Sequence, residues 1–414
     1  MTNPILADWK QEKLKNLLEK IIDNRGKSVP KADSGIPLIT ARNIREGYLD
    51  FSNQEFIDEL KYEDWMVRGI PEPTDILFTT EAPLGMACKF PAKGQYAIGQ
   101  RTIALRAKDK EITSDFLLYF FLSPYGQSVI DFRSTGSTAK GIKVKELKEL
   151  DIVFPIDKDE QHRIVAVLEA WDKALGKLIR KIELKKNIKK GLMQQLLTGK
   201  RRLKGFSGEW KTVKLGDVCE ICSSKRVLKK DWKSEGVPFY RTREIINLSN
   251  NDEFKSPIYI SDELYIKLKE KYGIPKAGDI LVTGVGSIGK TYITKNTDKF
   301  YFKDGNVLWI KVSNNINSNY LNQLFKTRFI KKQLFDNASI TTVATFTIEG
   351  ARKTYIKNPC FQEQTAIAKI LATADDEITA LGKKKQILEN QKKYLLNNLI
   401  TGQIRTPENL TISK

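Results

Sequence analysis

The string in this chain that most resembles a chemical site is "GDILVTGVGSIGKTYI", residues 278–293. Gly284, Gly289, Lys290 and Thr291 match the spacing of a P-loop, in which backbone amides and a lysine hold nucleotide phosphates. A P-loop continues into a helix whose first N–H groups face the phosphates. The residues that follow here, "TYITKNTDKF", are β-branched or aromatic and then turn-forming, so they predict a strand and a hairpin. We therefore expect a glycine-bearing β-turn here and no nucleotide site.

Two other short patterns could carry chemistry. "NPCF", residues 358–361, is similar to the Asn-Pro-Pro-aromatic motif of amino-methyltransferases, but Cys360 replaces the second proline and no glycine-rich cofactor loop accompanies it. Cys219 and Cys222 have the spacing of half a zinc site, yet a structural zinc takes four ligands and His162 is the one histidine. No carboxylate pair or Ser/His/Asp set suggests acid–base catalysis. We expect a chain that is not an enzyme and holds no cofactor or metal of its own.

The composition favours a globular protein that binds a polyanion. Of the 414 residues, 41% are apolar, which is enough for packed cores. The longest apolar run, residues 116–122, is far shorter than the ~20 residues of a membrane-spanning helix, and the N-terminal residues lack the pattern of a secretory signal. Lys and Arg number 70 against 50 acids, a formal net charge of +20, which points most simply to nucleic acid. We expect a cytoplasmic protein.

The chain contains one unit of about 200 residues written twice. Residues 160–202 and 363–405 align without a gap, with 15 of 43 positions identical, and both open with Glu-Gln. Shorter segments match at offsets between 201 and 204, such as "GIPLITARNI" with "GVPFYRTREI" and "PEPTDILFTTEAPLG" with "PKAGDILVTGVGSIG". In the first copy Met86 stands at the position of Lys290, which argues further against a P-loop. The repeat predicts two related modules, each followed by a similar segment.

Each similar segment predicts a long helix with one apolar stripe. The stripe has heptad a/d spacing and consists of Leu168, Trp171, Leu175, Leu178 and Ile182 in the first helix and of Leu371, Ala374, Ile378, Leu381, Leu388 and Leu395 in the second. Gly199 and Gly402 stand where a helix commonly ends in a left-handed residue. Because a long helix with a single apolar stripe needs a partner, we predict that the two helices form an antiparallel coiled coil with pseudo-twofold symmetry.

The remaining residues predict two α+β modules. Short strand-like runs, among them "DILFTT", "TIALRA", "DILVTG" and "VLWIKV", alternate with turn residues. One helical stretch is expected in each module, at residues 116–128 and 320–335. The expected segments are a first module at 1–159, a first long helix at 160–203, a second module at 204–362, and a second long helix with its tail at 363–414.

In the order of these features the chain resembles the specificity subunits of Type I restriction–modification systems. The doubled layout, the Glu-Gln helix openings, the closings "LLTGKRRL" and "LITGQIR", and the strings "GFSGEW" and "GDILVTGVGSIG" carry the resemblance. It implies that each module is a target-recognition domain that reads one half of a bipartite DNA site. The coiled coil would set the spacer and dock two methyltransferase (modification) subunits, and restriction motor-nuclease subunits would join them. S-adenosylmethionine, ATP and Mg²⁺ would then serve the partners. The alternative is a basic coiled-coil scaffold with only nonspecific DNA affinity.

Two loop stretches that recur in both modules are candidates for reading DNA, because Lys, Arg, Asn and Thr often contact bases and phosphates. The first stretch contains Thr40, Arg42 and Asn43, matched by Arg241, Arg243 and Glu244. The second contains Thr138, Lys140 and Lys143, matched by Thr341, Thr342 and Thr345. Ordinary solvated loops are the alternative for both stretches. On the helices, the matched lysines Lys189, Lys190, Lys392 and Lys393 are expected on or beside the partner-docking surface.

Overall fold

The computed structural model describes residues 7–24, 29–137, 139–256, 258–337, 339–340 and 344–410, with the backbone alone at residues 339, 340 and 344. The chain forms two compact units, of which the first comprises Met1–Ile179 with Lys383–Lys414 and the second comprises Arg180–Gly382. These units cross the expected linear boundaries because each long helix gives one half to each unit. No helix in the described part of the chain is long and apolar enough to cross a membrane.

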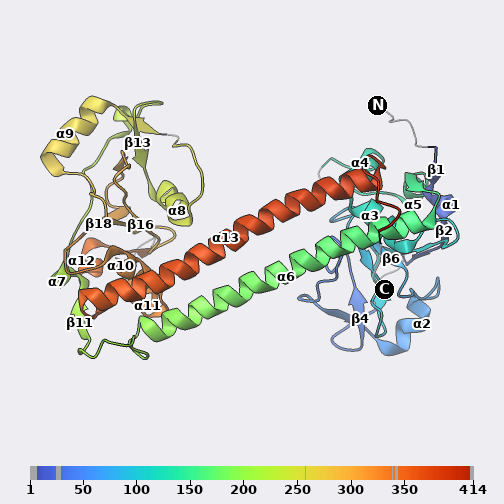
Figure 1. Cartoon of the computed structure of the whole chain (residues 1–414), viewed down its shortest axis with the longest axis horizontal. Coiled ribbons are helices and arrows are strands. Elements are labelled where there is room, and N and C mark those ends of the chain that lie inside the picture. The colour runs from blue at the N-terminus through green and yellow to red at the C-terminus, as the bar shows by residue number, and fades with distance from the viewer. Residues whose placement is uncertain are drawn as a thin grey trace. The chain divides into compact units, whose positions relative to one another are not determined.

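The first unit begins with short strands and helices and ends in the first long helix (Figure 1). Its elements are β1 (Trp9–Lys13), α1 (Leu14–Leu17), β2 (Leu18–Asp23), β3 (Lys31–Ala32), β4 (Ile36–Ile39), β5 (Glu55–Ile57), η1 (Glu59–Lys61), α2 (Tyr62–Trp65), β6 (Ile76–Thr79), β7 (Ala87–Lys89), β8 (Ala97–Ile98), β9 (Thr102–Ala107), α3 (Ser114–Leu122), α4 (Pro124–Phe132), α5 (Val144–Lys148), β10 (Asp151–Pro155) and the start of α6 (Lys158–Leu196).

A central sheet of order β2-β9-β6-β7 separates two cores of the first unit. Ile76 and Phe78 of β6 face one core with the α3 aromatics, whereas Leu77 between them faces the other core. This alternation follows from the two-residue period of a strand, and it explains why β6 is apolar throughout. A second sheet of order β3-β5-β4-β8 closes the second core, with β4 and β8 parallel, and β1 pairs with β10 outside both sheets.

The second unit repeats this plan with one added helix, α8 (Thr242–Asn250). Its elements are β11 (Lys211–Lys214), α7 (Leu215–Val218), β12 (Cys219–Cys222), η2 (Lys229–Asp231), β13 (Val237–Tyr240), α8 (Thr242–Asn250), β14 (Tyr259–Ile260), α9 (Asp262–Tyr272), β15 (Ile280–Thr283), β16 (Thr291–Ile293), β17 (Tyr301–Phe302), β18 (Val307–Val312), α10 (Ser318–Phe325), α11 (Arg328–Asp336), β19 (Ser339–Ile340), β20 (Ala344–Thr345), α12 (Ile348–Arg352), β21 (Tyr355–Asn358) and part of α13 (Phe361–Ile400).

Strand order in the second unit confirms the internal repeat. The order β12-β18-β15-β16 corresponds to β2-β9-β6-β7, and β14-β13-β17 corresponds to β5-β4-β8. β13 and β17 are parallel, as β4 and β8 are. In β15, Ile280 and Val282 face one core and Leu281 faces another, which repeats the alternation of β6. α8 has no counterpart in the first module, whereas α9 follows β14 as η1 and α2 follow β5, and the predicted α+β class is confirmed.

The expectation of one helical stretch per module was wrong, because each stretch is divided into two helices. Ser123 ends α3 and begins α4: its Oγ accepts a hydrogen bond from the Gly126 N–H at 2.9 Å. Lys326 ends α10, and Thr327 begins α11 in the same way, accepting from the Ile330 N–H at 3.2 Å. A hydroxyl that caps a helix N-terminus stabilises a new helix start, and Pro124 cannot continue the preceding helix.

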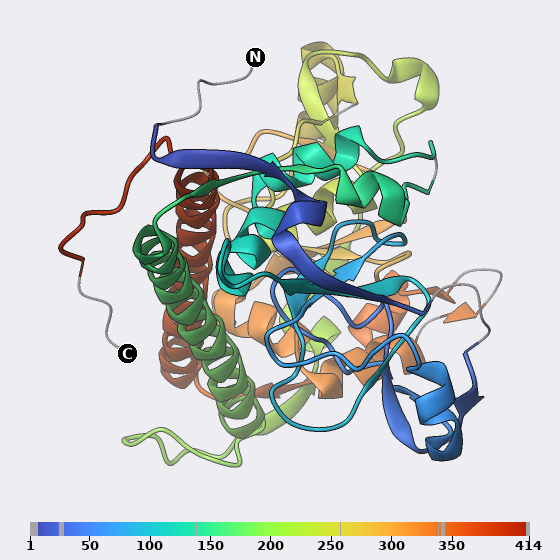
Figure 2. The ribbon, with the colours of Figure 1, turned by 90° about the vertical axis from the view of Figure 1, so that its right-hand side faces the viewer.

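Within each unit, half of α6 runs antiparallel to half of α13 (Figures 1 and 2). In the first unit Leu168 of α6 shares a core with Leu399 and Ile400 of α13. In the second, Leu196 of α6 shares a core with Leu371 of α13, and Lys185 pairs with Glu377 at 2.7 Å. The 39 residues of α6 and 40 residues of α13 are followed by Gly199 and Gly402, whose φ angles are 73° and 71°. The helix ends and the antiparallel direction are as predicted.

Candidate nucleic-acid interface

The P-loop-like string forms a β-hairpin turn, as predicted. β15 ends at Thr283, and β16 begins at Thr291, where a P-loop would begin a helix. The Thr283 Oγ1 accepts a hydrogen bond from the Lys290 N–H at 3.0 Å, and Gly289 has a φ of 80°. The first module builds the same turn, because Thr79 accepts from the Met86 N–H at 2.9 Å. A strand on both sides leaves no helix N-terminus to face a phosphate.

The Asn-Pro-Cys-Phe string connects β21 to α13. Gln364 Nε2 donates to Asn358 Oδ1 and to the Pro359 carbonyl, both at 2.9 Å, and Gln364 Oε1 accepts from the Asn317 N–H at 2.9 Å. These bonds hold the first turn of α13 against the start of α10. The four cysteines are free thiols, and among the described residues no group of three or more His, Cys, Asp or Glu could hold a metal ion.

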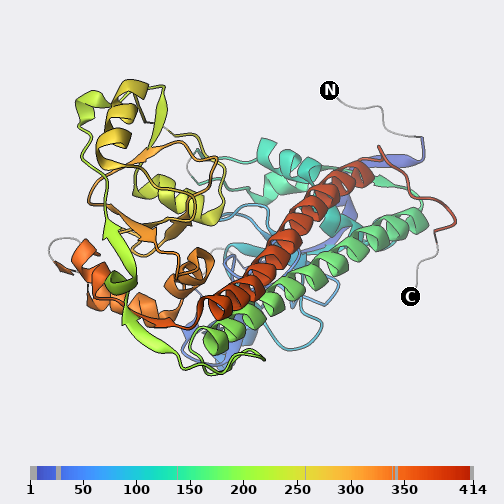
Figure 3. The same cartoon turned by 60° about the vertical axis from the view of Figure 1, so that its left-hand side comes forward.

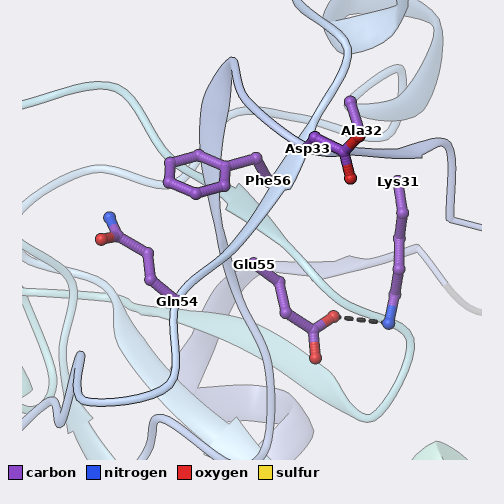
Figure 4. Close-up of a pocket in the computed structure, with 6 residues that line it drawn as sticks. All are labelled: Lys31, Ala32, Asp33, Gln54, Glu55 and Phe56. Carbon is purple, nitrogen blue, oxygen red and sulfur yellow. Dashed lines mark ion pairs between the residues drawn. The ribbon is translucent and has the colours of Figure 1, made fainter.

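One open pocket of about 410 Å³ lies beside β3 and β5 of the first module. Glu55 turns toward Lys31 and pairs with it at 2.5 Å, whereas Gln54 and Phe56 extend away from that pair (Figure 4). The pair neutralises the pocket's acid and base together, and Asp33 is the other titratable lining residue. The acid and the base of this pocket are therefore bound to each other and do not form a free pair for acid–base catalysis.

The first predicted stretch consists of a buried anchor and an exposed arginine. The side chain of Asn43 is fully buried, and its Oδ1 accepts from the N–H and hydroxyl of Thr40 at 2.9 and 2.8 Å. Its Nδ2 donates to the carbonyls of Asp50 and Asn53. Asn43 and Thr40 thus shape the loop after β4. Arg42, between them, is exposed and forms no hydrogen bond or ion pair with the described residues.

The matched stretch of the second module has the same division of roles with different chemistry. Glu244 is buried and accepts from the guanidinium of Arg241 at 3.0 and 3.2 Å and from the Arg241 N–H at 2.9 Å. This bonding begins α8, whereas the first module has a turn at this point. Arg243 is exposed and unpaired with any residue in the described ranges. Of the four arginine and asparagine candidates, Arg42 and Arg243 are therefore available to a ligand.

The second predicted stretch is a small hairpin anchored to the central sheet. In the first module Thr135 and Gly141 bond reciprocally at 2.9 Å, and the Ile142 N–H donates to the Thr80 carbonyl at 2.9 Å. Lys140 pairs with Asp131, whereas Lys143, just before α5, is exposed. Thr138 lies outside the described residues.

The corresponding hairpin of the second module joins the turn of the P-loop-like string. The Phe346 N–H donates to the Gly284 carbonyl at 2.8 Å, and Val285 and Thr345 form a β-bridge. Thr345 belongs to β20, the second strand of the hairpin β19-β20. Thr341 and Thr342 lie outside the described residues. The hairpin and the turn thus form one continuous surface segment in each module.

Backbone bonds bring both predicted stretches to one edge of each module. In the first module the Gly99 N–H donates to the Ile39 carbonyl at 2.8 Å, and the Thr80 N–H donates to the Arg101 carbonyl at 3.0 Å. In the second, Lys303 donates to Tyr240 and Gly284 donates to Asn306, both at 2.8 Å. The edge is formed by the carboxyl ends of β4 and β6 in one module and of β13 and β15 in the other. We call it the loop edge.

Sequence reasoning missed a basic segment at the loop edge of the second module. Residues 225–233 contain five Lys or Arg against one acid. The segment is held there because Ser223 Oγ donates to the Val307 carbonyl at 2.7 Å, and Arg226 pairs with Asp304 at 3.1 Å. Lys225 lies over the Tyr272 ring, 5.2 Å from its centroid. The density of basic residues next to a strand end was the signal that could have found it.

Two of the four helix lysines form ion pairs, and the other two are exposed. Lys189 pairs with Asp375 in the second unit, and Lys392 pairs with Asp172 in the first. These two matched lysines join α6 to α13. Their neighbours Lys190 and Lys393 are exposed, so they remain accessible to a partner. The matched apolar residues Leu184 and Ile387 are 59% and 56% exposed on the same helices.

The ends of the long helices are closed by matched buried carboxylates that sequence reasoning did not single out. Glu363 is bound by Arg202 through two hydrogen bonds of 2.8 Å and by the Trp210 indole N–H at 3.0 Å. Glu160 is bound by Arg405 at 2.5 and 2.7 Å, and Arg405 also pairs with Asp8. Those carboxylates hold the pKa of the Arg405 guanidinium well above its ordinary value. The Glu-Gln openings and the Arg closings of the repeat therefore act together, because the glutamate at the start of each long helix binds the arginine after the end of the other.

Comparison with known proteins identifies the family. The model of the Type I restriction modification DNA specificity domain matches residues 7–190 and again residues 207–389. A putative Type I restriction enzyme specificity subunit of Methanocaldococcus jannaschii is 25% identical, over 97% of this chain and 95% of that protein. A putative specificity subunit of Haemophilus influenzae is 34% identical, over 44% of this chain and 46% of that protein.

Two solved structures share the fold. The S subunit of a Type I restriction–modification system from M. genitalium has a TM-score of 0.57 at 17% identity, covering 96% of this chain and 97% of that one. A chain from a study of complex assembly in the Type I R-M system has a TM-score of 0.61 at 16% identity, covering 97% and 100%. The two domain matches together span most of the sequence, so the chain belongs to the Type I restriction–modification specificity subunits and carries two of their target-recognition domains.

Proposed function

We propose that this chain selects DNA for a Type I restriction–modification complex, with each module reading one half of a bipartite duplex site. The observation that carries the proposal is the contrast between scaffold and loop edge. The two modules share strand order and helix-end closure, yet Asn43 and Glu244 anchor different loops at the same place. Two readers of different half-sites on one scaffold need this combination.

Arg42 and Arg243 are the proposed base readers. They occupy matched positions, are exposed, and each adjoins a buried side chain that fixes the loop from which it projects. A guanidinium can donate two parallel hydrogen bonds to O6 and N7 of guanine in the major groove, which is the commonest specific side-chain contact to a base. Lys143 and the basic segment 225–233 would contact phosphates, which position the duplex without reading it.

The two long helices are proposed to dock two methyltransferase subunits, one on each copy of the same surface. Leu184 with Lys190 on α6 corresponds to Ile387 with Lys393 on α13. An exposed apolar residue and an exposed lysine, each present twice at the same repeat positions, are suited to a partner that binds twice. Restriction motor-nuclease subunits would join through those partners. S-adenosylmethionine, ATP and Mg²⁺ would be cofactors of the partners, and the complex would act in the cytoplasm.

Exchange of one module tests the division between readers. Residues 204–362 are replaced by the second module of another family member, and the host methylome is sequenced with the parent and the chimaera. We expect one half of the methylated motif to change and the other to stay. A change in both halves would refute independent reading. Binding of the parent to the bipartite duplex no better than to a scrambled duplex would favour the scaffold alternative.

Native mass spectrometry tests the docking surface. We expect two methyltransferase subunits per parent chain. Leu184→Asp and Ile387→Asp place a charge on one copy of the surface each, so each variant should retain one subunit and the double variant none. Two retained subunits in the double variant would move the docking surface elsewhere.

We also propose that the helix length sets the number of base pairs between the half-sites. Insertion of Leu-Ala-Glu-Leu after Lys181 adds nearly one helical turn, or ~6 Å. Since a base pair rises ~3.4 Å, the preferred gap should grow by one or two base pairs in methylation assays on duplexes of graded gap. An active variant with an unchanged gap would show that the partners position the modules.

A further inference from the structure

Two lysines of the second unit pair with one carboxylate, and a third lysine lies near them. Lys189 of α6 forms an ion pair with Asp375 of α13. Lys326, at the end of α10, has its Nζ 4.0 Å from Asp375 Oδ2, and Gln323 Nε2 donates to the same oxygen at 2.9 Å. Figure 3 shows α10, in orange, beside the start of α13, in red. The Thr291 hydroxyl donates to Asn322 Oδ1 at 2.5 Å, which brings the hairpin end with Lys290 to the same helix.

The positive charge of this group exceeds its negative charge. Desolvation lowers the pKa of the Lys326 ammonium, the Asp375 carboxylate opposes that shift, and the charges of Lys189 and Lys290 lower the pKa further. Lys290 forms no ion pair with any described residue, so no carboxylate of its own offsets the repulsion from the neighbouring lysines. Asp375 thus pairs with two ammonium groups, and Lys290 adds a third positive charge near Lys326, so an added anion would be stabilised by the excess positive charge.

The first unit has the carboxylate and lacks the excess charge. Asp172 is bound by Lys392 and by the Tyr119 hydroxyl at 2.8 Å, as Asp375 is bound by Lys189 and Gln323. Met86 stands at the position of Lys290. Leu122 stands at that of Lys326, since each directly precedes the residue that caps the next helix. The two additional lysines are therefore a property of the second module alone.

We propose that Lys189, Lys290 and Lys326, the lysine cluster, bind a backbone phosphate of the DNA that the second module reads. The lysine cluster is continuous with the loop edge, because Lys290 ends the turn whose Gly284 bonds Phe346 and Asn306 at 2.8 Å. At Gly286 of this turn no atom lies within 4 Å of where a Cβ would be, so the approach is open. Ammonium groups bind phosphate as point charges and recognise no base. The proposal rests on DNA recognition by this chain as proposed above.

Salt titration of DNA binding tests the lysine cluster. The full-length parent is compared with Lys290→Met, Lys326→Leu and the double variant, in which the substitutes are the residues of the first module. Lys331→Met removes an exposed lysine of α11 as a matched control. Binding to a random duplex is followed by fluorescence anisotropy over a range of salt concentrations. We expect the slope of log Kobs against log[salt] to decrease by ~0.9 in each single variant and by about 1.8 in the double variant, with a much smaller change for Lys331→Met.

Two further measurements separate a phosphate contact from other roles. The methylated motif should be the same for parent and double variant, because a phosphate contact carries no base information. A titration with ATP should show no binding that depends on Lys290. A double-variant slope equal to that of Lys331→Met would overturn the proposal, as would ATP binding that Lys290→Met abolishes. So would weakened assembly with methyltransferase subunits alongside an unchanged slope. If the parent binds no DNA, the proposed function fails with it, whereas an unchanged slope in a DNA-binding parent overturns the lysine cluster alone.

Discussion

The helix ends and the loop edges of the two units differ in how closely they match. At the helix ends, Glu160 with Arg405 repeats Glu363 with Arg202, and Asp172 with Lys392 repeats Asp375 with Lys189. At the loop edges, the first unit has an asparagine-anchored turn where the second has an arginine–glutamate pair that begins an added helix. The two units therefore share the ion pairs at the helix ends and differ in the residues at the loop edges.

This difference has a physical basis in burial. A buried carboxylate such as Glu363 needs its partner, because a lone charge away from water is strongly destabilising, so the pair can change only together. An exposed side chain such as Arg42 has water as its alternative partner, and its replacement leaves the scaffold intact. The exposed loop-edge side chains of the two copies can thus diverge, while both copies keep the same buried ion pairs between the helices.

Truncation of the matched helix leucines should produce the largest effect and test the sameness of the helix ends. Leu168 and Leu371 are fully buried at equivalent positions. Leu168→Ala and Leu371→Ala should each lower the free energy of unfolding of their own unit by ~3 kcal/mol, through lost transfer energy and a cavity. Urea unfolding followed by hydrogen exchange would localise each loss. A strong effect in one unit and none in the other would break the equivalence.

Replacement of the loop-edge arginines should separate the two readers. Arg42→Ala and Arg243→Ala should each weaken binding to the cognate duplex by ~1–3 kcal/mol, and each should relax the motif in a different half-site. Arg→Lys keeps the charge and loses the two-pronged donor, so it should restore affinity for random DNA but not base preference. Relaxation of the same half-site by both alanine variants would contradict separate readers.

The matched turn threonines should show a smaller and equal effect. Thr79→Val and Thr283→Val remove the hydroxyl that bridges each hairpin turn, so each should cost about 1–2 kcal/mol in unfolding free energy. Lys290→Met is the control, since its side chain is exposed and the turn uses its backbone N–H. Thermal unfolding measures all three. A nucleotide that stabilises the parent but not the Lys290 variant would revive the P-loop interpretation.

The smallest expected effect is in the pH dependence of the second unit. Desolvation raises the pKa of the Asp375 carboxyl, but the hydrogen bonds from Lys189 and Gln323 outweigh it and hold the pKa below its usual 3.8. A lowered pKa stabilises the fold above the usual value, and this stability is lost as pH falls through the lowered pKa. Because the side chain is 38% exposed, the contribution should stay below ~1 kcal/mol.

Asp375→Asn should remove that dependence. Unfolding of the parent and of the variant would be compared between about pH 5 and pH 2, with the difference in free energy shrinking as the pH falls. A difference that stays constant over this range would show that the ion pair with Lys189 does not stabilise the folded unit.

Much of this protein was readable from local pattern. The repeat at an offset of 203, the two long helices, their glycine ends and the hairpin in place of a P-loop all follow from residue periodicity and turn chemistry, and each is present in the structure. The family resemblance depended on the order of these same features. Local pattern suffices here because helix stripes and β-turns are set by neighbours within a few residues.

Which polar side chains face inward was decided only by tertiary packing. In the sequence, Arg42 and Asn43 look alike as candidates. In the fold Asn43 is buried and donates to the carbonyls of Asp50 and Asn53, whereas Arg42 is exposed. Lys189 and Lys190 look alike too, until Asp375 of the other helix pairs with the first. Lys189 and Lys326 pair with the same carboxylate, and Lys290 lies near Lys326, although long stretches of chain separate the three. Such outcomes depend on partners remote in sequence, because the cost of burying a polar group is removed only by the particular group that it meets.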